Sequence, residues 1–464
     1  MTRKVEEFQP IDKSNVKIYS CGPTVYVYPH IGNWFAFIHW DLLNRMLIAS
    51  GFKTTWVMNI TDVGHLVSDA DEGEDKLEKG AKREGKSAWD VAKFYEEYFL
   101  KGIERLNFLK PDFTPKATDY IPEQIDLIKE LEKDGFTYTI DDGVYFDTSK
   151  LVDYGKLAKL DIHSLKEGAR VEINVEKRNP TDFALWKFSP KDHKRDMEWE
   201  SPWGTGFPGW HLECSAMIKK LLGATIDIHT GGIDHIPVHH TNEIAQSETA
   251  FQQPLANYWM HTNFIKVDGQ KISKSLNNFF TLEDIEAKGF SLQAFRLLVL
   301  ESHYRSESQF SWETMQAAQN RLKSYQDMAD LKWQAKDLDT ETNELFDTKS
   351  ILEAMQEDLN SPLALSIISS KADILSDKLL PKANLKDFNI MLEFIDSILG
   401  MQLSNREDIT DDQKTLLTQR QEARDTKDWT KSDGLRDQLT GEGIEVRDTY
   451  AGQIWSRLCL NKLH

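Results

Sequence analysis

The sequence predicts an α/β protein with a split parallel sheet, an inserted middle, a helical bundle and a small C-terminal module. Two strand–loop–helix units, at 16–51 and 224–251, carry the apolar runs and glycine-rich loops of parallel sheets. Apolar residues at helical spacing then dominate from Phe280 to Leu403. With 464 residues, the chain is long enough for about three domains.

The first unit begins with a β-branched and aromatic run from Val16 to Tyr19, which is typical of a buried strand. A Gly-Pro turn follows, and an apolar-periodic helix then runs from PHIGN (29–33) to Gly51, a residue that commonly ends helices. KTTWVMNITDV (53–63) supplies the next strand and completes a βαβ unit. Parallel sheets of this kind bind ligands at the carboxyl ends of their strands.

The middle of the chain is predicted to be an insertion. Residues 69–89 are charged and poor in apolar residues, so we expect a solvated loop without function there. Helical spacing covers Val91–Phe108 and Pro122–Gly135, and TYTIDDGVYFD (137–147) is typical of a hairpin that turns at Asp-Gly. Sheet alternation resumes at ATIDIHTGGID (224–234), and a helix follows in PVHHTNEIAQSETAF.

The C-terminal half is predicted to be helical, with Pro362 at a helix start. The last segment adds two helices, Lys414–Lys427 and Lys431–Leu439, and a strand in GIEVRDT (443–449). From residue 414 onward there are nine Lys or Arg and eight Asp or Glu, whereas the whole chain carries a net charge of −19. A polyanionic partner would therefore need local basic surface, which this tail is free to provide.

Composition indicates a globular cytoplasmic protein. Hydrophobic residues make up 40% and charged residues 28% of the chain. The N-terminus lacks the apolar stretch of a secretory signal, and no uncharged run approaches the ~18 residues of a membrane span. The three cysteines, Cys21, Cys214 and Cys459, cannot form a disulfide framework, so we expect free thiols or metal ligands.

Two short motifs are suited to a polyphosphate. PHIGN lies at a helix N-terminus, where backbone N–H groups and the helix dipole favour phosphate, and His30 and Asn33 would add donors. KISKS (271–275) follows a predicted hairpin, NFIKVDGQKIS, and its two lysines form a mobile cationic loop. An ordinary capped helix start and a solvated basic loop are the alternatives. As a pair, the motifs resemble the ATP motifs of class I aminoacyl-tRNA synthetases.

Four residues are candidates for a metal site: Cys21 at the end of the first strand, Cys214 in WHLEC, and His239 and Glu243 in HHTNE. The last two lie four positions apart, so both side chains project from one face of a helix. Two thiolates, an imidazole and a carboxylate form a tetrahedral zinc set, with His240 as a competing ligand. A lone cysteine is usually a small buried hydrophobe, so the prediction depends on the split sheet bringing these residues to one edge.

These motifs resemble those of the cysteinyl-tRNA synthetases over nearly the whole chain. The motifs that carry the resemblance are CGPTVY (21–26), PHIGN, NITD (59–62), GWHLECSAM (209–217), DIHTGGID (227–234), HHTNEIAQSE (239–248), KISKS, SHYRS (302–306), MQEDLNSPLAL (355–365), WTKSDGLRDQL (429–439) and DTYAGQIW (448–455).

The resemblance implies a Rossmann-like catalytic core with a connective insertion, followed by an α-helical anticodon-binding bundle and a small tRNA-recognition module. The implied boundaries are 1–111 and 206–262 for the two halves of the core, 112–205 for the insertion, 263–320 for a stem-contact region with KISKS, 321–403 for the bundle, and 404–464 for the module.

The resemblance also implies ATP-dependent activation of L-cysteine and its transfer to tRNA(Cys) by a monomer. One Zn²⁺ would select the substrate thiolate, and Mg²⁺ would arrive with ATP. The implied metal ligands are Cys21, Cys214, His239 and Glu243. The implied catalytic residues are His30, Asn33, Lys271 and Lys274. ATP would contact His30, Gly32, Asn33, Asp234, Ile272 and Lys274, and cysteine would contact Cys21, Thr61, Trp210 and His229.

Some positions depart from the family pattern. Asn33 stands where many members have a second histidine, Ile272 replaces methionine, and IDHIPVHHTNE replaces the more usual approach to HHENE. The acidic pair that commonly follows NVTD in the family is also absent after NITD in this chain. These departures affect the expected geometry of the local loops and any role of His65 or His235.

Two other functions stay open. One is a ligase that joins cysteine to a small amine, and the long helical C-terminal half argues against it. The other is a catalytically silent tRNA-binding relative or a zinc-dependent interaction protein, and the intact motifs argue against it. Candidates for phosphate contact, which could equally be solvated arginines, are Arg305, Arg321, Arg424, Arg436 and Arg447.

Overall fold

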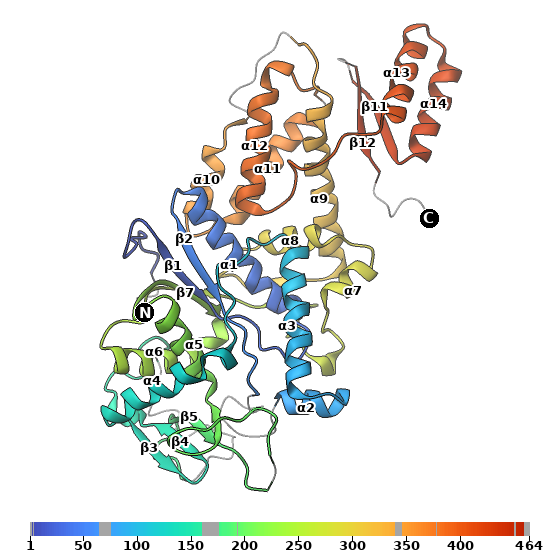
Figure 1. Ribbon diagram of the computed structural model, residues 1–464. Coiled ribbons are helices and arrows are strands. Elements are labelled where there is room, and N and C mark those ends of the chain that lie inside the picture. The colour runs from blue at the N-terminus through green and yellow to red at the C-terminus, as the bar shows by residue number, and fades with distance from the viewer. Residues whose placement is uncertain are drawn as a thin grey trace.

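The computed structural model describes residues 2, 4–64, 76–159, 176–192, 194–338, 346–376, 378–449 and 452–458. The molecule is elongated: the two four-stranded sheets occupy the middle and lower part of Figure 1, the helical bundle lies above them, and the last two helices are set apart at the upper right with β11 and β12. His65 and Cys459, named in the sequence analysis, lie outside the described residues.

A four-stranded parallel sheet, in the order β2-β1-β7-β8, forms the centre of the molecule. Its strands are β1 (Val16–Ser20), β2 (Thr54–Met58), β7 (Ile226–Gly232) and β8 (Ala256–Thr262). β1 and β7 are neighbours although the whole insertion lies between them in sequence. The predicted split sheet is therefore confirmed.

Helices cover both faces of this sheet. Ile18 and Met58 pack in one hydrophobic cluster with α1 (Ile31–Ala49). Tyr19 and Val57, the next residues along the same strands, pack in a second cluster with α5 (Trp210–Leu221) and α6 (His239–Phe251). This alternation explains why the strands read as continuous apolar runs.

The insertion forms a second, antiparallel sheet in the order β3-β4-β5-β6. Its elements are α4 (Ile121–Lys133), β3 (Thr137–Ile140), β4 (Gly143–Phe146), β5 (Phe183–Phe188) and β6 (Gly206–Pro208). The predicted hairpin is confirmed, but Asp141 and Asp142 form its turn. Gly143 is the first residue of β4, where a Cβ atom would lie 2.3 Å from the carbonyl oxygen of Trp186. Glycine is therefore required at this position because the neighbouring strand approaches closely, and not because the hairpin turns there.

The prediction of a loop at 69–89 is wrong for residues 76–89, the part that the structure describes. This part contains α2 (Lys76–Glu84) and the start of α3 (Ala88–Arg105). Leu77 and Ala81, one helical turn apart, are buried beneath α3, and the Ser87 side chain caps that helix. So short a helix is stabilised mainly by tertiary packing, which composition does not reveal.

The region after the core contains β9 (Ile265–Val267), α7 (Leu282–Ala287), α8 (Leu292–Leu300) and β10 (Ser308–Phe310). Asp268 and Gly269 have φ of 48° and 76°, so the predicted Asp-Gly turn exists. Its second strand does not form, because only Val267 and Gln270 form a bridge, and β9 pairs instead with β10 in parallel.

The bundle consists of α9 (Trp312–Asp330), α10 (Lys349–Gln356), α11 (Ser361–Leu375) and α12 (Leu385–Leu399). Pro362 lies in the first turn of α11, as predicted. The terminal module contains α13 (Asp411–Asp425), α14 (Trp429–Gly441), β11 (Ile444–Thr449) and β12 (Gly452–Arg457), of which β12 was not predicted. Among the described residues, no helix has the length and apolar character to cross a bilayer.

Candidate metal and nucleotide site

A cleft of about 780 Å³ opens at the carboxyl ends of the parallel strands. Cys21 follows β1, Asn59 follows β2, and Asp234 follows β7, and all three line the cleft. Of the predicted site residues, those that line it are Cys21, His30, Gly32, Asn33, Thr61, Trp210, Cys214, Asp234, His239, Lys271, Ile272 and Lys274. The other two, His229 and Glu243, are fully buried behind its floor.

The four predicted metal ligands converge at this floor. One donor atom from each of Cys21, Cys214, His239 and Glu243 lies within 4.8 Å of every other. Cys214 Sγ is 3.6 Å from His239 Nε2, which is 2.9 Å from Glu243 Oε1. Cys21 Sγ is 4.0 Å from that same Oε1. Side chains from β1, α5 and α6 therefore form one buried cluster that could hold a metal ion.

His240, the competing ligand, belongs to a second possible metal set. One donor atom from each of Cys21, His229, His240 and Glu243 also lies within 4.8 Å of every other. Cys21 Sγ lies 3.4 Å from His240 Nε2, whose other ring nitrogen is 2.8 Å from His261 Nε2. This second set leaves the buried Cys214 thiol unused.

The first set uses both described thiols, and two of its ligands have outer partners. His239 Nδ1 lies 3.0 Å from His211 Nδ1, and Glu243 Oε2 is 2.9 Å from His229 Nε2. Partners of this kind orient metal ligands. We therefore favour the first set, with His229 as a support for Glu243.

Neighbouring side chains shift the pKa values of the groups in the cluster. Burial alone raises the pKa of Glu243, but the neighbouring His229 and His239 hold it well below its usual range. Burial disfavours imidazolium at His239, but Glu243 and Cys214 raise its pKa to about 10. A hydrogen bond from Cys21 and one from His239 lower the pKa of Cys214 to about 7. Metal binding would therefore displace a proton from His239 and, because burial raises the pKa of the Cys21 thiol, from Cys21 as well.

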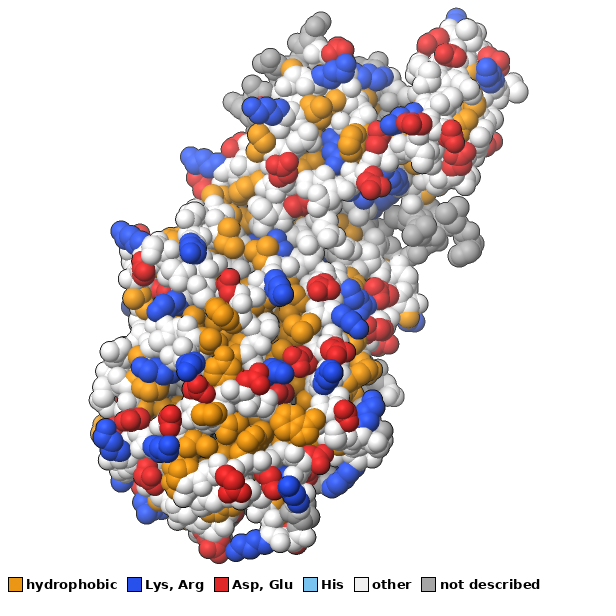
Figure 2. Space-filling model, in the orientation of Figure 1, with side chains coloured by type: hydrophobic (Ala, Val, Ile, Leu, Met, Phe, Trp, Pro, Cys, Tyr) orange, Lys and Arg blue, Asp and Glu red, His pale blue; other side chains and the backbone are white. Residues whose placement is uncertain are grey.

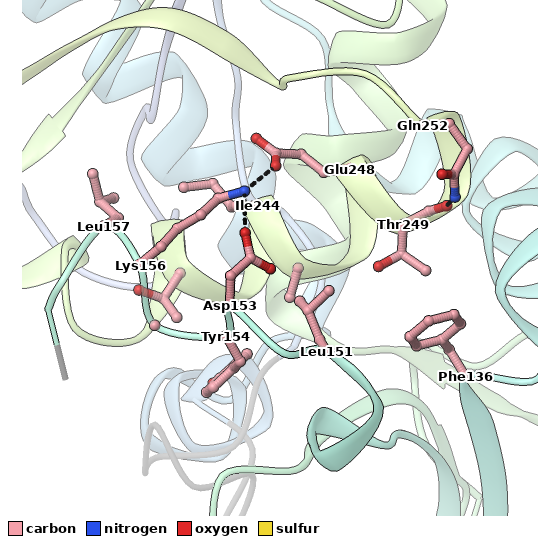
Figure 3. Close-up of a pocket in the computed structure, with 13 residues that line it drawn as sticks. Phe136, Leu151, Asp153, Tyr154, Lys156, Leu157, Ile244, Glu248, Thr249 and Gln252 are labelled. Carbon is pink, nitrogen blue, oxygen red and sulfur yellow. Dashed lines mark hydrogen bonds and ion pairs between the residues drawn. The ribbon is translucent and has the colours of Figure 1, made fainter. Parts of the chain in front are cut away.

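The other side of α6 lines a separate cavity of about 280 Å³. There Lys156, from the insertion, forms ion pairs with Asp153 and with Glu248 of α6 (Figure 3). Tyr154 adds a buried hydrogen bond of 2.6 Å to Asn242 Oδ1. These contacts fix the helix that carries His239 and Glu243 from behind.

At the other end of the cleft, His30 caps α1. Its Nδ1 accepts hydrogen bonds from the backbone N–H groups of Gly32 (3.0 Å) and Asn33 (3.3 Å), while Asn33 Oδ1 accepts from the His30 N–H (3.0 Å). The capped helix start, offered above as an alternative, is therefore what forms, and these two N–H groups are not free for phosphate. Burial, with a contribution from Lys274, lowers the pKa of His30 to about 4, so the imidazole is neutral and its proton lies on Nε2.

The two polyphosphate motifs adjoin each other. Lys274 Nζ lies 5.1 Å from the centre of the Phe279 ring, against which His30 packs edge-on at 5.0 Å. Ile272 closes over Gly32, where a Cβ atom would lie 3.0 Å from Ile272 Cδ1. PHIGN and KISKS, the two motifs that the resemblance pairs, therefore lie side by side at this end of the cleft.

Comparison with known proteins agrees with this architecture. Residues 7–320 match the family described as tRNA synthetases class I (C) catalytic domain, and residues 406–455 match the cysteinyl-tRNA ligase anticodon binding domain. Cysteine--tRNA ligase 1 of Burkholderia lata is 46% identical over 97% of this chain and 94% of that protein. The Cysteine--tRNA ligase of Treponema denticola is 41% identical over 98% of each chain.

The chain belongs to the cysteinyl-tRNA ligase family. It shares its fold with a Mycobacterium tuberculosis methionyl-tRNA synthetase structure, at a TM-score of 0.60 and 14% identity over 84% of this chain and 93% of that one. Membership of this class I family implies the use of ATP.

Several residues around the site of this cysteinyl-tRNA ligase family member escaped sequence analysis. Thr61, a predicted cysteine contact, donates to Glu213 Oε2 (3.1 Å) and accepts from Asn59 Nδ2 (3.1 Å). His229 stacks on Trp259 at 4.8 Å, and Trp210 lies 4.4 Å from the ring of His239. The missed residues are Tyr19, Asn59, His211, Glu213, Trp259 and His261. Of these residues, only His211 and Glu213 have a signal in the sequence, because they lie beside Cys214 in the WHLEC motif.

The five arginines considered for phosphate contact all have intramolecular partners. Arg305 pairs with Asp358, Arg321 pairs with Glu301, and Arg447 donates to the carbonyl of Ser376. Asp448 binds both Arg424 (3.0 Å) and Arg436 (3.2 Å). On the face shown in Figure 2, basic and acidic side chains are interspersed over the bundle and module. To contact RNA phosphates, these arginines would therefore have to leave their present partners or share themselves between partner and phosphate.

Proposed function

We propose that this chain is a cysteine–tRNA ligase that activates L-cysteine with ATP and transfers it to tRNA(Cys). The observation that carries the proposal is the buried quartet of Cys21, Cys214, His239 and Glu243 on the floor of the cleft that also holds PHIGN and KISKS. Relatives that carry this name align over nearly the full chain, which supports the proposal.

The quartet would hold one Zn²⁺. Its two thiols, imidazole and carboxylate are preferred donors of this ion, and spacings of 2.9–4.0 Å leave room for bonds of about 2.0–2.3 Å. Bound zinc supplies a metal–sulfur bond that a cysteine thiolate makes and the hydroxyl of serine reproduces poorly. A hydrophobic pocket alone separates such close analogues by only about 1–3 kcal/mol. Thr61 and Trp210 line the cleft beside the quartet and would contact cysteine, whereas His229, predicted as a third contact, is buried and would act through Glu243.

Activation requires no general base, because the carboxylate of the substrate is already ionised. That carboxylate attacks the α-phosphorus of ATP, a new O–P bond forms, and the bond from phosphorus to pyrophosphate breaks. His30 Nε2–H and the Lys274 ammonium would donate to phosphate oxygens, so positioning and charge stabilisation lower the barrier. Mg²⁺ would accompany ATP. Other residues assigned to the nucleotide end are Gly32, Asn33, Asp234, Lys271 and Ile272.

In the second step, a hydroxyl oxygen of the terminal adenosine of tRNA attacks the carbonyl carbon of cysteinyl adenylate; an ester bond forms, the bond from that carbon to the phosphate oxygen breaks, and AMP leaves with the hydroxyl proton released. The helical bundle and the terminal module would bind the rest of the tRNA. A small amine acceptor requires no such surface, so this half of the chain favours tRNA over the amine ligase alternative.

Reciprocal variants test the proposal. Cys214→Ser should lose bound zinc and raise the KM for cysteine by about 100-fold or more in cysteine-dependent ATP–pyrophosphate exchange. Lys274→Ala should keep the zinc but lower the exchange rate about 100- to 1,000-fold. Elemental analysis of the purified variants supplies the metal content, so each variant is the control for the other.

Charging of tRNA(Cys) then separates the alternatives. Exchange without charging would indicate the amine ligase, and the absence of exchange in the wild type would indicate a silent relative. Full zinc content and unchanged cysteine affinity in Cys214→Ser would refute the assigned metal set.

A further inference from the structure

α2 packs against the rim of the cleft. Leu77 and Ala81 are buried against α3 in one cluster with Val25, which belongs to the loop after β1. At Gly80 a Cβ atom would lie 3.7 Å from the backbone oxygen of Tyr26, a cleft residue. The position of α2 is therefore coupled to the wall of the nucleotide end.

Arg83 extends from this helix toward the same rim. Its Nη2 lies 3.4 Å from the hydroxyl oxygen of Tyr95, to which it donates. The Tyr95 ring packs edge-on against Tyr28 at 5.0 Å, and Tyr28 lines the cleft. Tyr28 also contacts Phe94 and Tyr98, so α3 fixes this part of the rim.

The same helix α3 is bound to the segment that follows KISKS. Arg105 forms ion pairs with Glu283 (2.6 Å) and Glu286 (2.5 Å), and Tyr98 donates to Glu283. α2, α3 and α7, the helix that follows the KISKS loop, are thus held together beside the cleft; in Figure 1, α2 lies at the lower end of α3.

Lys274 lines the mouth of this cleft, and Arg83 approaches the mouth from α2 behind Tyr95 and Tyr28, although the chain is strongly acidic overall. Burial and the positive charge of Arg83 lower the pKa of Lys274. Lys274 in turn contributes to the lowered pKa of His30. Cations held close together repel each other, and an anion placed between them relieves that repulsion.

We propose that Arg83 is a further catalytic residue, which binds the pyrophosphate part of ATP from α2, opposite Lys274 at the mouth of the cleft. This inference rests on the proposed function. As the carboxylate–phosphorus bond forms and the bond to pyrophosphate breaks, negative charge grows on the leaving group, and the Arg83 guanidinium would stabilise it with charge-assisted hydrogen bonds.

The test compares Arg83→Ala with Lys82→Ala, which removes the same charge from the exposed neighbouring position of α2. In cysteine-dependent exchange, Arg83→Ala should raise the KM for pyrophosphate and lower kcat, with a combined loss of about 10- to 100-fold. Arg83→Lys should recover part of this loss, and Lys82→Ala should change it less than about 2-fold.

A second readout separates this role from a structural one. Single-turnover transfer of cysteine from isolated cysteinyl adenylate to tRNA involves no pyrophosphate, so Arg83→Ala should leave its rate unchanged. An equal loss in exchange and transfer would overturn the assignment to pyrophosphate. Equal behaviour of the Arg83→Ala and Lys82→Ala variants would overturn it as well.

Direct binding keeps the two proposals distinguishable. Calorimetric titration of each protein with inorganic pyrophosphate requires no chemistry, and Arg83→Ala should weaken this binding about 10-fold or more relative to Lys82→Ala. That result together with absent exchange would refute the proposed function and retain the anion contact. Normal exchange and unchanged pyrophosphate binding in Arg83→Ala would refute the role of Arg83 and leave the proposed function intact.

Discussion

His30 can cap α1 only while it is neutral. Its Nδ1 accepts two backbone N–H groups at the start of α1, and only an unprotonated Nδ1 can do so. Its pKa of about 4 lies below the ordinary value of 6.5, chiefly because of burial. As pH falls, the unfolded chain therefore takes up this proton before the folded protein does. The stability contributed by neutral His30 is complete above about pH 6.5 and is lost as pH falls toward 4.

A variant can isolate this dependence. His30→Asn keeps a good helix cap but removes the titrating group. Between pH 7 and pH 5, the free energy of unfolding of the wild type should fall by about 1–2 kcal/mol more than that of His30→Asn. Urea unfolding at both pH values measures the difference, and parallel pH dependence in the two proteins would contradict this account.

Sequence reasoning could propose the quartet because two of its signals are local: Cys21 ends a predicted strand, and positions 239 and 243 share a helix face. Its convergence depended in addition on the predicted split sheet, which the structure confirms. His261 and Trp259 carry no such signal, because their approach to His240 and His229 depends on how β8 packs beside β7. The capped helix start at His30 was one of two alternatives that the sequence left open, since only the rotamer decides whether its ring faces the backbone or the cleft.

At the scale of elements, α3 packs on α1 through a glycine. A Cβ atom at Gly102 would lie 2.4 Å from Cη2 of Trp34, a fully buried residue of α1. Gly434, in α14, has no atom within 4 Å of the corresponding position. The two helical glycines therefore differ only in what faces them.

Alanine should have opposite effects at these sites. Gly434→Ala should stabilise the terminal module by about 0.5–1 kcal/mol, because alanine favours helix. Gly102→Ala should destabilise the core by about 1–3 kcal/mol, because overpacking against Trp34 exceeds that gain. Chemical unfolding, followed by tryptophan fluorescence for Gly102→Ala and by circular dichroism for Gly434→Ala, measures both changes. Stabilisation by Gly102→Ala would show that Trp34 moves freely.

Long periodic elements were predictable, whereas α2 and β12 were not. α1, α3 and α4 follow apolar spacing closely, so their predicted ranges agree with the structure within a few residues. α2 has too few apolar residues for a period to stand out, and its packing against α3 decides its state. β12 became a strand because β11 offers it an antiparallel partner.

Across the whole molecule, a buried charge network joins core and bundle. Asp41 of α1 binds Arg45 (2.8 Å) and Arg296 of α8, and both Asp41 and Arg296 are fully buried. Arg296 Nε donates to the carbonyl of Leu399 (2.7 Å), and Arg45 donates to that of Ser397 (3.1 Å). Burial lowers the pKa of Arg296 to about 10, so it remains charged at neutral pH.

Loss of this network should be costly. Arg296→Met should lower the free energy of unfolding by about 3–5 kcal/mol, because Asp41 loses a partner in a buried site. Arg105→Met removes exposed ion pairs with Glu283 and Glu286 and should cost less than about 1 kcal/mol. Thermal and urea unfolding compare the two variants, and equal losses would mean that the buried network adds no special stability.

The split sheet has a consequence for biosynthesis. A nascent chain presents Cys21 early, but Glu243 leaves the ribosome about 220 positions later, roughly 10 to 45 s at 5–20 residues per second. During that interval the first thiol has no partner ligand from α6, and the insertion is made before β7 can join β1. Loading of the proposed metal would therefore be a late event, and an ion that reached the unfinished polypeptide would meet at most part of its coordination sphere.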